Sequence, residues 1–175
     1  RAVVTRDDLR HFFGAGDILC PITLGILGPN ARRMQRAIRE LIERQPSCPL
    51  RREDAFYDTL CAWNSVPYVA RSEDDSFAGY LILRDNKRVS ELLVPENGSY
   101  EELIKALFEK LDARELEFTA PLAHPRLCAL LYALAEEQQL IQCENFNILN
   151  YERVIRAFLT LKSRSTPLCD GALTL

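Results

Sequence analysis

The stretch RVSELLVPENGSYEELIKALF, residues 88–108, decides the fold that this sequence predicts. Its first part contains the apolar run Leu92–Val94 and ends at Pro95, which has no N–H group to donate to a sheet. Ser99 can then begin a helix as its N-cap, with Glu102 three residues later as the other half of a capping box. We therefore expect a strand, a tight turn and a helix.

The expected helix has a clear buried face, because Leu103, Ile104, Leu107 and Phe108 recur at helical spacing. A strand that runs directly into a helix N-terminus often binds an anion, since the first N–H groups of the helix are unpaired and the helix dipole is positive there. The central question is whether the turn at residues 95–98 binds such a ligand.

Composition limits the function classes. The chain has 175 residues, of which 47% are hydrophobic and 27% charged, as in a soluble globular domain. Its net charge of -3 gives no reason to expect a nucleic acid or an acidic membrane as a partner. No apolar run approaches the ~20 residues that span a bilayer. The six cysteines include no C-x-x-C pair, so we expect no metal site, and reduced thiols in the cytoplasm. No signal peptide is evident, and Arg1 in place of an initiator Met suggests an excised chain.

The other expected elements alternate around the central stretch. In order, they are a short helix capped at Thr5, a strand at 18–27, helices at 31–45 and 51–62, strands at 68–71, 77–84 and 88–94, the helix at 99–112, a strand at 115–120, a helix from 125 to about 139, a strand at 146–149 and a helix at 151–162. Asn30 is expected to cap the helix at 31–45. Polar connectors separate the three strands that end at residue 94, which predicts an antiparallel meander.

This order of elements resembles the GNAT acetyltransferase superfamily over residues 22–149. FAGYLILR, residues 77–84, looks like the third strand of that family, and ELLVPENG, residues 91–98, looks like the fourth strand running into the coenzyme loop. HPRLCALLYALAEEQ, residues 124–138, looks like the last helix, where the family has a tyrosine. The resemblance implies an α+β (α/β) fold, a mixed central sheet of about six strands with helices on both faces, and acetyl-CoA as coenzyme.

A narrower resemblance concerns the position of the domain. Residues 31–60 look like the start of the second GNAT-like domain of enhanced-intracellular-survival (Eis) type proteins, and residues 150–173 look like the opening of their sterol-carrier-like domain. It implies a lead-in and first strand at 1–27, a GNAT-like domain at 28–149 and a truncated segment at 150–175. The implied partner is an adjacent GNAT domain of the same parent protein.

The coenzyme loop departs from the family pattern. An active GNAT domain has a Q/R-x-x-G-x-G/A loop, whereas this chain has only PENG before Ser99, with the single glycine Gly98. Glu101 and Glu102 occupy the first turn of the helix, where carboxylates suit the dipole themselves and repel a pyrophosphate. This departure argues against normal acetyl-CoA binding.

Two interpretations follow. In the first, the domain is degenerate and structural, supports a catalytic N-acetyltransferase domain, and in isolation exposes apolar patches and self-associates as a homo-oligomer. In the second, the chain is an acetyltransferase in which Tyr132 is the general acid and Glu91 the base, and Val94 with Asn97, Gly98 and Ser99 supplies backbone donors to the coenzyme. The simpler structural assignment of Tyr132 is a half-buried helix tyrosine, and that of Glu91 is a strand glutamate that faces solvent. We favour the first interpretation; His11 and His124 are lone histidines without a catalytic partner.

Overall fold

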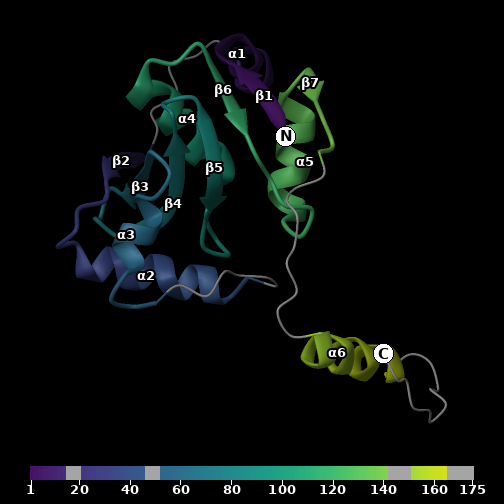
Figure 1. The fold of residues 1–175 in the computed structure, drawn as a ribbon. Coiled ribbons are helices and arrows are strands. Elements are labelled where there is room, and N and C mark those ends of the chain that lie inside the picture. The colour runs from purple at the N-terminus through teal and green to yellow at the C-terminus, as the bar shows by residue number, and fades with distance from the viewer. Residues whose placement is uncertain (15–20, 46–51, 142–150, 165–175) are drawn as a thin grey trace. The chain divides into compact units, whose positions relative to one another are not determined.

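The computed structural model describes residues 1–14, 21–45, 52–141 and 151–164. The chain divides into two compact units, Arg1–Leu140 and Ile141–Leu175 (Figure 1). In the second unit the described residues form helix α6, Tyr151–Ser163. No described helix is long and apolar enough to cross a membrane. The expected strand at 146–149 lies outside the described residues.

One mixed sheet forms the centre of the first unit. Its strands are β1 (Ala2–Thr5), β2 (Ile22–Ile26), β3 (Ser65–Ser72), β4 (Phe77–Arg84), β5 (Arg88–Leu93), β6 (Glu115–Phe118) and β7 (Glu137–Gln138). Among the described residues this sheet has seven strands in the order β2-β3-β4-β5-β6-β1-β7, and only β5 and β6 pair in parallel. The predicted meander is confirmed as β3, β4 and β5.

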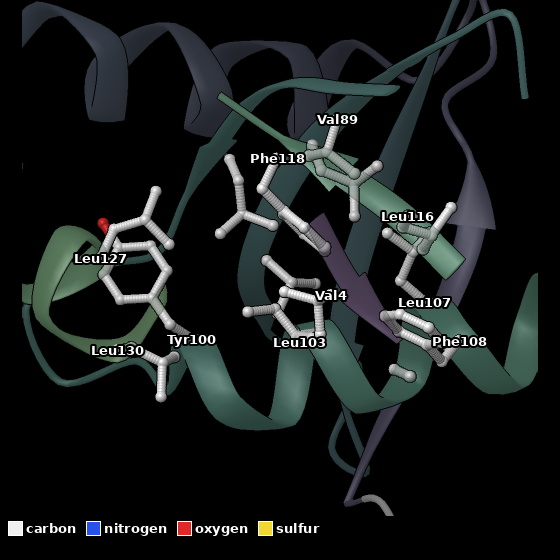
Figure 2. Packing of buried hydrophobic residues seen from close by; sticks show 14 of the residues in the cluster. Val4, Val89, Tyr100, Leu103, Leu107, Phe108, Leu116, Phe118, Leu127 and Leu130 are labelled. Carbon is white, nitrogen blue, oxygen red and sulfur yellow. The ribbon is translucent and has the colours of Figure 1, made fainter. Parts of the chain in front are cut away.

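Helices cover both faces of this sheet, as predicted. They are α1 (Arg6–Phe13), α2 (Arg32–Glu43), α3 (Phe56–Leu60), α4 (Tyr100–Leu111) and α5 (Pro125–Leu134). A large buried cluster packs α1, α4 and α5 on one face, around side chains such as Leu103, Leu107 and Phe118 (Figure 2). A smaller cluster packs α2 and α3 on the other face, against Tyr80 and Leu93.

Two of the three predicted helix caps are present. The Oγ of Ser99 accepts a hydrogen bond from the backbone N–H of Glu102 at 3.1 Å and so begins α4. Thr5 caps α1 in a complete capping box with Asp8. The predicted Asn30 cap is wrong. Asn30 lies in a turn before the helix, where its backbone carbonyl oxygen accepts a hydrogen bond from the N–H of Arg32 at 2.8 Å. The N-cap position of α2 is Ala31, without a side-chain cap.

The last predicted helix of the first unit is shorter than expected. It ends at Leu134, and Ala135 already has extended backbone. The chain then forms β7 at Glu137–Gln138, at the edge of the sheet. Because β7 has only two residues, no period-2 pattern could reveal it in the sequence.

The first residues of the chain form a strand inside the sheet, where the sequence predicted a lead-in. β1 is inserted between β6 and β7 and runs antiparallel to both. Ala2 and Val4 point into the large buried cluster, and each is less than 5% exposed. A strand of four residues gives too short an alternation to be recognised, and its partners lie more than a hundred residues further along the chain.

A buried carboxylate fixes β1 to its neighbours. Glu117 of β6 is only 4% exposed. It accepts a hydrogen bond from the Nε of Arg88 on β5 at 2.6 Å and another from the guanidinium of Arg1. The terminal amine of Arg1 donates to the carbonyl oxygen of Gln139 at 3.0 Å. Two cations therefore neutralise the buried charge, and they join β5, β6 and the start of β1.

The parallel pair of β5 and β6 is short. Its register comprises Arg88 with Glu117 and Val89 with Phe118, and the N–H of Thr119 donates to the carbonyl oxygen of Val89 at 3.0 Å. Beyond this point β5 continues to Leu93 without β6 as a partner. The two strands therefore separate toward their carboxyl ends, which is where open sheets with parallel strands usually bind ligands.

Gly79→Ala is expected to lower the free energy of unfolding by about 1–3 kcal/mol. An added Cβ would lie 2.9 Å from the carbonyl oxygen of Leu93 and 3.1 Å from Cγ1 of Val94, and the backbone oxygen of a central strand cannot move aside. Gly25→Ala is the matched control, because a Cβ on this glycine of β2 meets nothing within 4 Å. Urea unfolding measures both variants, and equal losses would contradict the close packing of β4 on β5.

Glu117→Ala is expected to lower the free energy of unfolding by about 1–3 kcal/mol, because it leaves two arginines without their shared acceptor. Glu115→Ala is the control, since Glu115 pairs with Lys87 at 2.8 Å with both side chains more than half exposed. Such surface pairs contribute little to stability. Thermal or urea unfolding of both variants checks the difference, and a neutral Glu117→Ala would show that Arg1 does not anchor β1.

Candidate functional site

A cavity of about 480 Å³ lies just beyond the carboxyl end of β5. Its walls come from the second half of α2, the turn after β5, and the first residues of α4 and α5. Among its lining residues are Glu40, Arg44, Val94, Glu96, Tyr100 and Arg126. It is therefore the place where the sequence analysis asked whether an anionic coenzyme binds.

The aromatic ring of Tyr100, the first residue of α4, packs into the hydrophobic core. Tyr100 is 8% exposed and belongs to the same buried cluster as Leu127 and Leu130 of α5, as Figure 2 shows. Burial raises the pKa of the Tyr100 phenol, while the Arg126 guanidinium and the backbone N–H of Val94 act in the opposite direction. Val94, a predicted coenzyme donor, also lines this cavity.

The turn before α4 packs closely on the end of β5. The N–H of Gly98 donates to the carbonyl oxygen of Pro95 at 2.8 Å and closes the turn. A Cβ on residue 98 would lie only 2.8 Å from the Cβ of Val94. This contact within the chain accounts for the glycine, so Gly98 needs no pyrophosphate beside it to explain its presence.

Arg126 crosses from α5 to the same turn. Its Nη1 donates to the carbonyl oxygen of Glu96 at 2.8 Å, and its Nη2 donates to that of Gly98 at 2.9 Å. The guanidinium carbon also lies 5.7 Å from the centroid of the Tyr100 ring, within the range of a cation–π contact. A phosphate-binding loop presents N–H groups to its ligand. This turn instead presents two carbonyl oxygens to a cation.

Acidic side chains occupy the first turn of α4. The hydroxyl of Ser99, which accepts from the N–H of Glu102, itself donates to Oε2 of Glu101 at 3.0 Å. Two carboxylates therefore lie at the positive end of the helix dipole, where they stabilise the helix. The charge that a bound pyrophosphate would supply is already present in the chain.

The structure places the two predicted catalytic residues away from the cavity. Tyr132 lies on α5 with 77% of its surface exposed, where a half-buried side chain was the plainer expectation. Glu91 lies on β5, half-buried, and accepts a hydrogen bond from the hydroxyl of the fully buried Tyr80. Neither residue lines the cavity, whereas Val94 does.

The two histidines are also separated. His124 lines the cavity and precedes α5, where its side chain makes no cap hydrogen bond. His11 lies in the last turn of α1. Among the described residues, no group of three or more His, Cys, Asp or Glu side chains could hold a metal ion.

Sequence reasoning did not find Arg126 or Tyr100. Arg126 follows the proline at the start of α5, an ordinary surface position, and its acceptors are 28 and 30 residues away in the sequence. A signal for Tyr100 was available, because a large aromatic residue stands directly after the Ser99 cap.

Comparison with known proteins identifies the fold. No protein-family model matches the sequence, and no curated protein matches it. Solved structures do match. A ribosomal-protein-alanine N-acetyltransferase from Brucella melitensis gives a TM-score of 0.56 at 15% identity, over 72% of this chain and 99% of that one.

An aminoglycoside acetyltransferase from an uncultured soil metagenomic sample, in complex with trehalose, gives a TM-score of 0.54 at 16% identity, over 75% of this chain and 100% of that one. A Vibrio cholerae spermidine N-acetyltransferase in complex with CoA and spermine gives a TM-score of 0.50 at 13% identity, over 73% of this chain and 88% of that one. At these identities the likeness concerns the fold. The chain therefore has the mixed sheet and two helical layers of the GNAT acetyltransferase fold, as the sequence predicted.

Proposed function

We propose that this chain is a GNAT-like domain that does not bind acetyl-CoA in the usual way and that supports a catalytic N-acetyltransferase domain of the same parent protein. Its role would be structural: it would pack beside the catalytic domain and shape the cleft for the acetyl acceptor. The free thiols of Cys61 and Cys128 fit a reducing, cytoplasmic environment.

The observation that carries this proposal is the contact of Arg126 with the turn. A coenzyme loop works because backbone N–H groups converge on the pyrophosphate. In this chain the guanidinium of Arg126 draws the carbonyl oxygens of Glu96 and Gly98 toward α5. On the side of the turn that faces α5, a pyrophosphate would therefore meet carbonyl oxygens rather than N–H groups.

Charge and packing support the same proposal. Glu101 and Glu102 in the first turn of α4 would repel a pyrophosphate that approached the helix N-terminus. Tyr100 and Val94, which line the cavity, also belong to the buried cluster together with Leu92 and Leu127. The apolar wall of the cavity is therefore part of the hydrophobic core.

The identity of the parent rests on the sequence resemblance to Eis-type proteins. Under this proposal residues 28–149 correspond to the second GNAT-like domain, preceded by its lead-in and first strand at 1–27, and the segment from residue 150 opens a sterol-carrier-like domain. The division of the chain at Leu140 is consistent with such a boundary. The exposed apolar side chains Trp63, Leu122 and Leu140 are candidates for contacts with the neighbouring domains or with a second copy of the chain.

An active acetyltransferase remains the alternative, and the cavity of about 480 Å³ at the end of β5 is the observation in its favour. It requires Tyr132 and Glu91 to reach the reacting groups. The exposure of Tyr132 and the hydrogen bond of Glu91 with Tyr80 both weigh against this requirement.

Calorimetric titration of the folded chain with acetyl-CoA is expected to give no binding heat up to millimolar ligand. Circular dichroism before and after the titration confirms that the chain is folded. A micromolar Kd, about -8 kcal/mol, would contradict the proposal. Acetyl transfer by the native chain that is lost in Tyr132→Phe and Glu91→Gln would establish the alternative.

Arg126→Ala is expected to speed hydrogen exchange at the backbone amides of residues 96–99 and to lower stability by about 1–2 kcal/mol, because two charge-assisted hydrogen bonds are lost. Arg52→Ala is the control: Arg52 is an exposed arginine whose guanidinium contacts Asp54 at 2.7 Å, and its loss should leave these amides unchanged. If both variants exchange at the native rate, Arg126 does not hold the turn.

A further inference from the structure

Three charged side chains form a row across three neighbouring strands of the sheet. Arg84, the last residue of β4, is paired in register with Arg88 of β5, and Arg88 is paired with Glu117 of β6. Side chains of residues that are paired across strands lie on the same face of a sheet. Two guanidinium groups and one carboxylate therefore lie next to each other, beside the turn that joins β4 to β5.

The carboxylate in this row already has two cationic partners. Glu117 accepts hydrogen bonds from the Nε of Arg88 at 2.6 Å and from the guanidinium of Arg1. Arg84 adds a third guanidinium group on the next strand, so the row carries positive charge although the whole chain has a net charge of -3. Like charges that face each other across two strands destabilise a sheet. The pairing of Arg84 with Arg88 is therefore unfavourable for the fold alone.

Arg84 has no acceptor among the described residues. Its Nε is the buried side-chain nitrogen or oxygen atom that lacks a hydrogen-bond partner in the part of the chain that the structure describes. The carboxylate of the next residue, Asp85, accepts from Nδ2 of Asn64 at 2.7 Å instead. A buried N–H group without an acceptor is rare in native proteins, because its lost contact with water is not replaced. The negative charge that would match Arg84 is therefore missing from its surroundings in the chain.

From these features we propose that Arg84 and Arg88 bind a small oxyanion, a phosphate or a carboxylate group, between β4 and β5. Guanidinium groups bind such ligands through pairs of parallel N–H donors. The donors are available, because the described hydrogen bond of Arg88 uses only its Nε, and the side chain of Arg84 is partly exposed although its Nε is buried. The bound oxyanion supplies the negative charge that the row lacks.

This site is separate from the coenzyme turn. Arg88 is the first residue of β5, whereas the turn at residues 95–98 follows the other end of that strand. The proposal therefore does not depend on whether the chain binds acetyl-CoA.

The variant Arg84→Met tests the unmatched charge without a ligand. Methionine keeps much of the apolar stem and removes the guanidinium group, so the urea midpoint is expected to rise in a buffer free of phosphate and carboxylate. Arg52→Met is the control, because Arg52 is exposed and pairs with Asp54 at 2.7 Å, and it should leave the midpoint unchanged. A midpoint that falls in Arg84→Met would overturn the proposal, since the guanidinium group would then have stabilising partners in the chain.

Binding is measured by NMR on the arginine Nε–H signals of the isotopically labelled full chain. The signal of Arg84 is identified as the one that Arg84→Met lacks. Titration with inorganic phosphate at constant ionic strength is expected to shift the signals of Arg84 and Arg88 saturably and to leave that of Arg52 in place. Arg84→Met should weaken the binding seen at Arg88 by about tenfold or more, the effect of losing a charge-assisted hydrogen bond.

A parallel titration with succinate distinguishes the two ligand chemistries. Saturable shifts with phosphate alone assign a phosphate group, and shifts with succinate alone assign a carboxylate. The proposal is overturned if neither anion shifts the signals of Arg84 and Arg88, or if chloride shifts them equally. It is also overturned if Arg52 responds as strongly as Arg84, or if Arg84→Met binds both anions as the native chain does.

Discussion

The short parallel pairing of β5 with β6 is the constraint on which the site depends. Because the strands share only the register at Arg88–Glu117 and Val89–Phe118, they separate toward their carboxyl ends, where a cavity of about 480 Å³ lies. Side chains of the chain itself pack beside this cavity. Tyr100 enters from the start of α4, Leu127 enters from α5, and both join the buried cluster of the sheet. The same separation that could admit a ligand therefore contributes to the hydrophobic core.

The electrostatics of the turn are the second part of this arrangement. A helix N-terminus offers unpaired N–H groups and positive potential, and a protein can satisfy both with a ligand or with its own side chains. Here Ser99 caps the helix, Glu101 and Glu102 supply negative charge, and Arg126 binds the carbonyl oxygens of the preceding turn. The chain thus satisfies the helix N-terminus and the preceding turn with its own side chains.

Local patterns in the sequence predicted most of the fold. The strand, turn and helix at residues 88–112 followed from a proline, a serine cap and helical spacing, all of which act within a few residues. The strand β1 could not be predicted, because its partners in β6 and β7 and its anchor at Glu117 are distant in sequence. A four-residue strand carries its information in tertiary pairing.

The candidate site, like the fold, could be predicted only in part from the sequence. The missing second glycine and the two glutamates were visible in the sequence and argued against normal acetyl-CoA binding. The contact of Arg126 with the turn and with Tyr100 was not visible, since it forms only after α5 has packed beside α4. The predicted roles of Tyr132 and Glu91 came from family resemblance, and the structure places both away from the cavity that Val94 lines.

The most direct measurement of the central claim is an NMR titration of the isotopically labelled chain with acetyl-CoA, following the backbone amide signals of Val94 and residues 96–99. The account predicts that these signals do not move up to about 1 mM ligand, the concentration at which an affinity of about -4 kcal/mol becomes visible. Saturable shifts confined to these amides would contradict it, because they would show that the turn releases Arg126 and presents its N–H groups to the coenzyme.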